Sequence, residues 1–244
     1  MDRDALSAIL VPLDLAPVFQ VPSGDLLRGI RGHEPGVDVR GVHSATFGAA
    51  LGPGRSQETL DLELLDRGMV VRLSSLSPRR FADRLLAGDV DLLEEVHAAE
   101  PFAGSDALAD LRRIAAPMCD GATVAALRKR GEEALSRAGA DVRKRAREVL
   151  AALRWILSGL HLAKTGEIRP DLPSLAAWHG EGWLVELSAR SGTEALSGSP
   201  AVTSFWLSEI EILRKRLRKE EPGMAARDRD AVRDGLEEWI RGLP

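Results

Sequence analysis

Glycine, carboxylate and guanidinium groups come together early in the chain, in a pattern that is typical of phosphate binding. A short apolar run leads into Gly24, and a second glycine follows at Gly29. Glycines at a strand-to-helix turn let backbone N–H groups approach a phosphate, and the start of a helix attracts negative charge. Residues 37–42 then alternate apolar and polar, so Asp38 and Arg40 fall on one face of a strand. We therefore predict a strand, a turn with a helix, and a second strand around a phosphate loop.

This stretch resembles the nucleotidyltransferase domain of the DNA polymerase beta superfamily, in particular a bacterial group of predicted nucleotidyltransferases. That group reads Gly-Ser, three residues, Tyr-Gly or His-Gly, then Ser-Asp-x-Asp-x-Arg-Gly-Val. Gly24 and Gly29 fall on the two motif glycines, and Asp38 falls on the second carboxylate. Residues 40–42, Arg-Gly-Val, match the end of the motif. The resemblance implies a nucleoside triphosphate as ligand and transfer of a nucleoside monophosphate to a hydroxyl acceptor.

Three motif positions depart from the family. Asp25 stands in place of the motif serine, and Gly36 in place of the first carboxylate. The third carboxylate of the family, aligned through Phe81, falls on Ser77. Carboxylates of this superfamily hold paired divalent cations that bridge the triphosphate. The resemblance therefore implies magnesium with Asp38 as the surviving metal ligand and catalytic carboxylate, and transfer that is weak or lost because two of three acids are absent.

The resemblance extends along a later helix. The family has a long helix with an arginine two-thirds along it, ending in Thr-Gly, which Arg154 and residues 165–166 match. Asp25 placed beside a triphosphate should repel it. The nucleotide-binding residues implied by the resemblance are Gly24, Asp25, Gly29, Arg40 and Arg154.

Other carboxylates could replace the missing ones. Asp61 and Glu63 share one face of an alternating segment, 59–64. Such a face is more often solvated than metal-binding, but these two residues and Glu34 are the first substitutes to test. Glu94 matches a glutamate of the family pattern.

The pattern of apolar residues, together with the fold that the resemblance implies, predicts an α+β fold. A hairpin over 59–73 and a helix from residue 78, capped by Ser77, follow the first two strands. The clearest helix is 141–164, with apolar residues at i, i+3, i+4 and i+7. We expect a nucleotidyltransferase-like mixed β-sheet with flanking helices over 1–104, then an all-helical domain over 105–244. A nucleotide would bind in the cleft between them.

Two hypotheses of other classes stay open. One is a non-catalytic nucleotide-binding, RNA-binding or regulatory interaction module, for which the basic runs 128–130 and 143–147 could face a nucleic acid. The other is a ribonuclease, because the spacing of Arg154 and His161 resembles the Arg-x4–6-His pattern of HEPN ribonucleases. Basic runs are more often solvated helix faces, and one Arg and His pair on an amphipathic helix is a common coincidence.

Composition describes an ordinary globular chain. Its net charge of −4 argues against general electrostatic attraction to nucleic acid, although it allows a local basic patch. One cysteine, Cys119, excludes an internal disulfide and fits a reducing cytoplasm. No run approaches 18 apolar residues, so we expect a cytoplasmic protein without a membrane segment.

Overall fold

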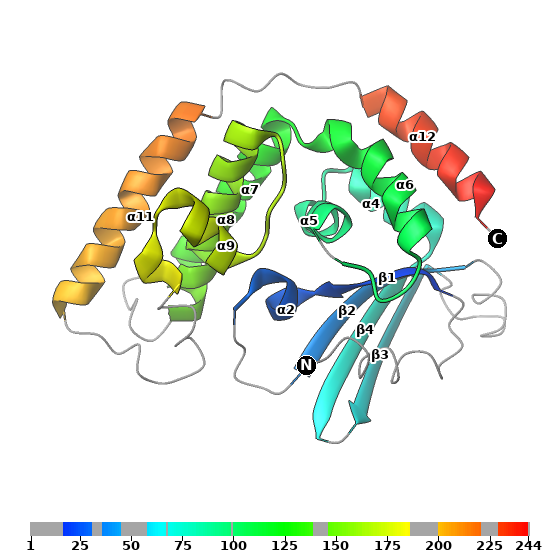
Figure 1. Cartoon of the computed structure of the whole chain (residues 1–244), viewed down its shortest axis with the longest axis horizontal. Helices are drawn as coiled ribbons and strands as arrows, with labels where there is room; N and C mark the ends of the chain where they lie inside the picture. Colours follow the sequence, from blue (N-terminus) through cyan, green and yellow to red (C-terminus); the bar gives the residue numbers. More distant parts are fainter. Residues whose placement is uncertain are drawn as a thin grey trace. The chain divides into compact units, whose positions relative to one another are not determined.

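The protein has the predicted α+β fold, with a mixed sheet followed by a helical region (Figure 1). The computed structural model describes residues 17–30, 36–44, 58–66, 68–98, 100–138, 146–185, 200–220 and 229–243. The chain forms two compact units, named here the sheet unit and the helical unit. The sheet unit comprises Met1–Leu27, Glu34–Pro117 and Asp228–Pro244, and the helical unit comprises Arg28–His33 and Met118–Arg227.

Four strands form the sheet, in the order β1-β2-β4-β3. They are β1 (Pro17–Ser23), β2 (Gly36–His43), β3 (Thr59–Asp66) and β4 (Met69–Leu76). The pairs β1–β2 and β3–β4 are antiparallel, whereas β2 and β4 are parallel. The predicted hairpin is therefore confirmed, and Gly68 between its strands has a φ of +81°, a conformation that favours glycine.

Helices of the sheet unit cover one face of the sheet. They are α2 (Gly24–Arg28), whose last residue belongs to the helical unit, α4 (Pro78–Leu86), α5 (Val90–Ala98), α6 (Ser105–Ala115) and α12 (Arg229–Gly242). Ser77 caps α4 as predicted, because its hydroxyl accepts a hydrogen bond from the Arg80 N–H at 3.3 Å. Phe19 on β1 meets Phe81 on α4 edge to face, with ring centroids 5.5 Å apart. Both rings are fully buried, so they anchor α4 on the sheet.

The other face of the sheet is apolar. Val37 and Val39 on β2 and Val71 and Leu73 on β4 form a buried cluster, against which three leucines of β3 pack: Leu60, Leu62 and Leu64. Alternation along β2 and β4 puts these side chains on the face opposite to Asp38, as period two requires.

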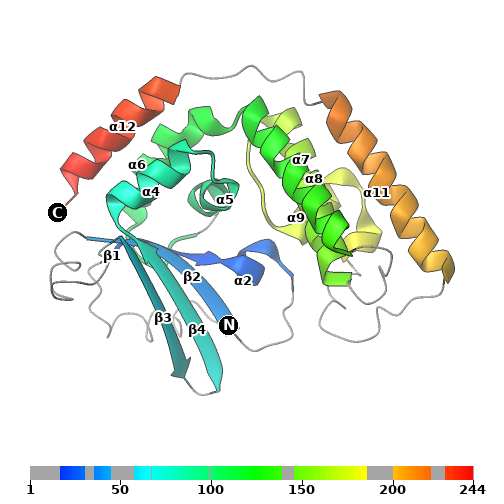
Figure 2. The same cartoon turned by 180° about the vertical axis from the view of Figure 1, so that it is seen from behind.

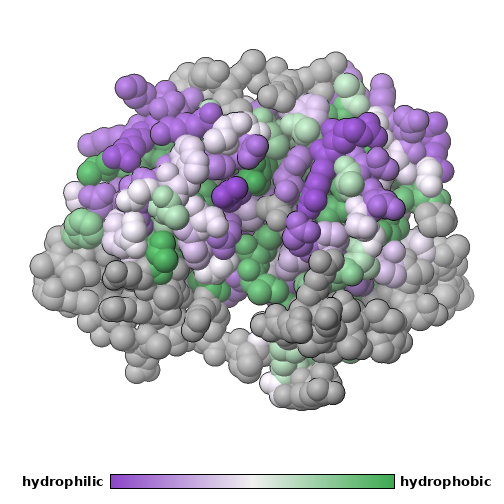
Figure 3. Space-filling view, in the orientation of Figure 1, coloured by the Kyte–Doolittle hydropathy of each residue, from purple (hydrophilic) through white to green (hydrophobic). Residues whose placement is uncertain are grey.

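The C-terminal helix α12 packs against α4 and α6 of the sheet unit. Trp239 is its anchor: the ring lies 6.5 Å from that of Phe81, and its Nε1–H donates to the Ala107 carbonyl at 3.3 Å. Figure 3 shows hydrophilic side chains on the exposed side of this helix. The observed units therefore differ from the predicted division at residue 104, because the sheet unit continues to Pro117 and includes the last helix of the chain.

The helical unit is built around α8 (Ala146–Thr165), which packs against α7, α9 and α11 (Figure 2). Its other helices are η2 (Ala116–Met118), which it shares with the sheet unit, α7 (Gly121–Ala138), α9 (Leu172–His179) and α11 (Pro200–Glu220). The helix predicted over 141–164 is present from residue 146, where the described part begins. Among the described helices, none combines the length and the apolar character that crossing a bilayer would take.

We expect Trp239→Ala to lower the free energy of unfolding by about 3 kcal/mol, because it removes a large buried ring and a hydrogen bond. Urea denaturation followed by far-UV circular dichroism measures the change. Glu237→Ala, on the exposed side of the same helix, is the matched control and should change stability by less than about 0.5 kcal/mol. Equal effects of the two substitutions would show that α12 does not depend on this anchor.

Candidate functional site

Gly24 joins β1 to α2 and lies directly against Asp38. Its φ is +58°, in the left-handed region. Ser23 pairs with Asp38 in the antiparallel register of β1 and β2, which puts the turn beside the carboxylate. A Cβ added to Gly24 would lie 3.0 Å from the Asp38 Cγ and closer still to its Oδ2. Both the backbone conformation and the close approach to Asp38 therefore require glycine here.

A row of three charged side chains crosses the sheet beside this turn. Arg72 on β4 pairs in register with Asp38 on β2 and with Glu63 on β3, so the three residues lie on one face. The Arg72 Nη1 is 3.8 Å from the Asp38 Oδ1, and its Nε donates to the Glu63 Oε2 at 3.3 Å. All three side chains are more than 40% exposed, so each pair contributes about 0–1 kcal/mol. We call these residues the charged row.

A buried carboxylate holds the second arginine of the site. Glu95 on α5 is 3% exposed; it accepts a hydrogen bond from the Ser23 hydroxyl and lies 3.6 Å from the Arg40 Nε. Arg40 is two residues beyond Asp38 on β2, so both project from the same face, as the sequence predicts. One glutamate therefore ties β1, β2 and α5 together and limits where the Arg40 guanidinium can lie. Glu94, which the family pattern singled out, is its buried neighbour.

The remaining predicted residues fall into different parts of the fold. Asp25 follows Gly24 in the first turn of α2, within the sheet unit. Gly29 and Arg154 belong to the helical unit. Gly29 has a φ of +65°, and a Cβ on it would lie 2.7 Å from the Pro173 Cδ, so packing against the start of α9 accounts for this glycine without a ligand. Arg154 is fully buried, with its guanidinium 3.5 Å from the centroid of the Trp155 ring.

The described residues around Asp38 do not fit a magnesium ion. Gly36 supplies no ligand, and Ser77 caps α4. The Arg72 guanidinium lies beside Asp38, where a cation would bind. Throughout the described residues, no three or more His, Cys, Asp or Glu side chains are grouped to hold a metal. Magnesium needs several oxygen ligands in near-octahedral geometry, which this set does not provide.

Asp61 and Glu63, the two suggested substitutes that the structure describes, do not complete a metal site. Glu63 faces Arg72, and Asp61 lies two residues along the same strand face, opposite Ser74. Glu34 lies outside the described residues. Arg72 was missed by the sequence analysis although it stands in a predicted strand, because only the parallel pairing of β2 with β4 brings it to Asp38.

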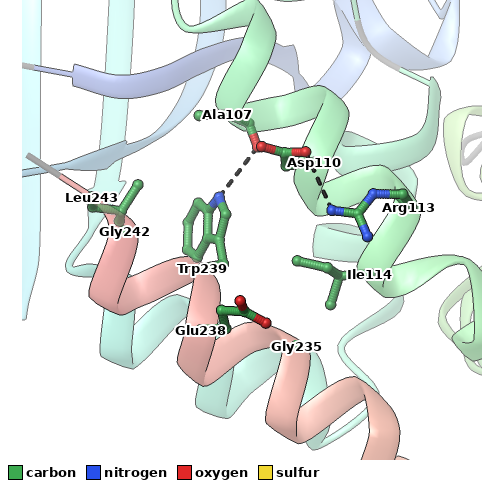
Figure 4. Close-up of a pocket in the computed structure, with 9 residues that line it drawn as sticks. All are labelled: Ala107, Asp110, Arg113, Ile114, Gly235, Glu238, Trp239, Gly242 and Leu243. Carbon is green, nitrogen blue, oxygen red and sulfur yellow. Dashed lines mark hydrogen bonds and ion pairs between the residues drawn. The ribbon is translucent and has the colours of Figure 1, made fainter.

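A pocket elsewhere in the sheet unit has different chemistry. It holds about 410 Å³ between α6 and α12, and Figure 4 shows Trp239 and Ile114 among its lining residues. Its charged side chains are Glu238 and the ion pair of Asp110 and Arg113, at 3.4 Å. None of the predicted site residues lines this pocket.

Helix α8 of the helical unit carries a buried polar stripe of Arg154, Ser158 and His161, at i, i+4 and i+7. The Ser158 hydroxyl and both His161 nitrogens have no hydrogen-bond partner among the described residues. His161 meets the Trp178 ring edge to face at 4.7 Å. Arg154 and His161 thus share a face, as the ribonuclease hypothesis requires, but they are at most 2% exposed. RNA would reach them only if the unit opened.

The basic run on α7 is partly neutralised. Arg128 pairs with Glu132 at 3.3 Å, and the same carboxylate meets Arg214 and Arg218 of α11 at 3.7 and 3.4 Å. Burial raises the pKa of Glu132, but the three guanidinium groups outweigh it and hold the pKa below its usual range. The second run, 143–147, has no described side chains.

Comparison with known proteins gives only a distant likeness to solved structures. No protein-family model matches the chain, and no curated protein matches its sequence. Among solved structures, it is similar to a nucleotidyltransferase-like protein from Exiguobacterium sibiricum 255-15, with 12% identity over 98% of this chain and 74% of that one, at a TM-score of 0.34. A likeness this distant carries no weight for function, which must be inferred from the geometry of the site.

We expect Gly24→Ala to lower the free energy of unfolding by about 3 kcal/mol, because alanine must adopt positive φ and displace the Asp38 carboxylate. Gly88→Ala is the matched control: Gly88 has a φ of +82° but no described atom within 4 Å of the added Cβ, so only the backbone cost of about 1 kcal/mol applies. Urea unfolding of both variants measures the difference. Equal losses would mean that Asp38 does not lie against the turn.

Acid should destabilise the helical unit through His179. Burial lowers the pKa of His179 to about 4; the hydrogen bond to the Leu157 carbonyl opposes this, and Lys164 and His161 add to it. The pKa in the folded state is therefore below the unfolded value of 6.5, so the stability that depends on neutral His179 is complete above about pH 6.5 and is lost as pH falls toward 4.

Urea midpoints at about pH 7 and about pH 5 test this expectation. The urea midpoint of the wild type should be lower at about pH 5 than at about pH 7. His179→Gln, which cannot gain a proton at this position, should show a smaller decrease. Burial also lowers the pKa of His161 and His97, so part of the wild-type loss should remain in the variant. An identical fall in both proteins would contradict the assignment to His179.

Proposed function

We propose that this protein is a nucleotidyltransferase-like, nucleotide-binding protein in which transfer of a nucleoside monophosphate is weak or absent. One observation carries the proposal: the left-handed glycine turn after β1 lies against a single carboxylate on β2. A glycine at such a turn has no Cβ of its own to cover its backbone N–H group, which can therefore approach a phosphate.

Arg40 supports phosphate binding at this turn. Its guanidinium projects from the same strand face as Asp38 and is restrained by the buried Glu95 carboxylate. A restrained guanidinium loses less entropy when it binds a phosphate, and its planar fork matches phosphate oxygens. The arrangement of Gly24, Asp38 and Arg40 therefore fits a phosphate-bearing ligand.

Weak or absent transfer follows from the shortage of carboxylates. Asp38 is 42% exposed and paired with an arginine, whereas Gly36 and Ser77 carry no charge. Asp25 adds negative charge next to the turn, which opposes a triphosphate. The site can hold a phosphate group but has little means to stabilise the charge that develops during transfer.

A second candidate function is RNA binding by the helical unit. Glu132 is surrounded by Arg128, Arg214 and Arg218, which leaves excess positive charge on this part of α7 and α11. Positive charge of this kind attracts a phosphate backbone without sequence specificity. The buried positions of Arg154 and His161 give no support to RNA cleavage.

Calorimetric titration with ATP, GTP, CTP and UTP, each with magnesium and with excess EDTA, tests the first candidate. We expect saturable binding of at least one nucleotide, weakened about tenfold by Arg40→Gln because a charge-assisted contact is lost. Incubation with α-³²P-labelled nucleotide should leave the label unattached to protein or added RNA.

Arg80→Gln is the matched control, since Arg80 is an exposed arginine on α4 of the same unit. It should bind nucleotide as the wild type does. Absence of binding to all four nucleotides in both buffers would contradict the proposal and leave RNA binding as the remaining candidate. Rapid label transfer would contradict weak catalysis.

A further inference from the structure

Arg72 lies at the centre of the charged row, where three neighbouring strands meet on one face. We propose that its guanidinium takes the place of a divalent cation at this site, so that the site receives the phosphate groups of a nucleotide without metal. The inference rests on the proposed nucleotide-binding function and adds to it the source of positive charge and the independence from magnesium.

The first support is the space that the guanidinium occupies. Its Nη1 lies 3.8 Å from the Asp38 Oδ1 and 3.2 Å from the point where a Cβ on Gly36 would be. Gly36 and Asp38 are two residues apart on β2 and face the same way. The guanidinium therefore lies close both to Asp38, the motif carboxylate that β2 retains, and to Gly36, the motif position on β2 that lacks one. A longer side chain at Gly36 would meet the arginine.

The second support is the balance of charge. Arg72 has a carboxylate on either side, Asp38 from β2 and Glu63 from β3, and it reaches both. A divalent cation bound to the same carboxylates would lie within a few ångströms of a fixed positive charge, which repels it. Arginine is effectively always protonated in proteins, so a change of pH does not remove this charge. The positive charge of Arg72 within the charged row therefore disfavours binding of a metal ion.

The third support is the exposure of the guanidinium to solvent. Arg72 and Asp38 are 43% and 42% exposed, and an ion pair this exposed is weak enough to exchange for a phosphate. Guanidinium offers five donors in a planar fork, and Arg40 on the adjacent strand of the same face provides a second one. The nearby carboxylates reduce the affinity of the site for phosphate, but phosphate binding still needs no metal ion.

Nucleotide titration of Arg72→Ala is the first arm of the test. The wild type should bind nucleotide equally well in EDTA and in magnesium, within about twofold, and Arg72→Ala should bind about tenfold more weakly in EDTA. Arg79→Ala, which removes an exposed and paired arginine from α4, is the matched control and should bind as the wild type does. Wild-type binding that requires magnesium would overturn the inference while leaving the proposed function standing.

Titration with Mn²⁺ in the absence of nucleotide is the second arm. We expect no saturable binding by the wild type or by Gly36→Asp, because in Gly36→Asp the new carboxylate lies against the Arg72 guanidinium. The double variant Gly36→Asp/Arg72→Ala should show saturable Mn²⁺ binding, through oxygen ligands on β2 and β3. Circular dichroism and urea midpoints confirm that each variant is folded.

The two arms separate the two proposals. If no nucleotide binds in either buffer, the proposed function fails, and the Mn²⁺ arm alone decides whether Arg72 occupies the place of a cation. Mn²⁺ binding by the wild type that is lost in Asp38→Ala and unchanged in Arg72→Ala would overturn the inference, since the metal would then share the site with the arginine.

Discussion

The parallel pairing of β2 with β4 is the contact on which the rest of the site depends. It places β4 in the middle of the sheet, with the edge strand β3 on its far side. Because the register sets Arg72 opposite both Asp38 and Glu63, the charges of three strands meet on one face. A shift of one residue would turn Arg72 toward the apolar face, where Val71 and Leu73 now pack. Burial of that apolar face therefore holds the charged row in register.

Two arginines on this face differ in what restrains them, and this difference divides their roles. Arg40 is held by a buried glutamate that also binds the turn through Ser23, so its position is built into the packing of α5. Arg72 is held by exposed carboxylates that solvent screens. A buried pair keeps a side chain in place, whereas an exposed pair can exchange one anion for another. The site thus combines a guanidinium that is held in place, that of Arg40, with one whose carboxylate partners can be replaced by another anion, that of Arg72.

Local signals explain which parts of the fold were predictable. The cap of α4 was recognised because Ser77 and the following proline act within one turn of the helix. The hairpin was recognised because its strands are adjacent and alternate at period two. The sequence places Gly24 at a strand-to-helix turn, where its φ is +58°, whereas Gly29, which the motif places with it, is accounted for by packing against α9. The place of α12 beside α4 was not predictable, because residues distant in sequence form that contact.

By itself, the sequence determined the α+β class, the strand–turn–helix around Gly24 and the shared strand face of Asp38 and Arg40, since helix caps, turns and alternation depend on neighbours within a few residues. Only the tertiary structure decided that Arg72 lies beside Asp38, that Glu95 holds Arg40, and that Arg154 is fully buried. Strand order and burial arise from contacts between segments that are distant in sequence. A local sequence pattern therefore does not show which charged side chains will pair.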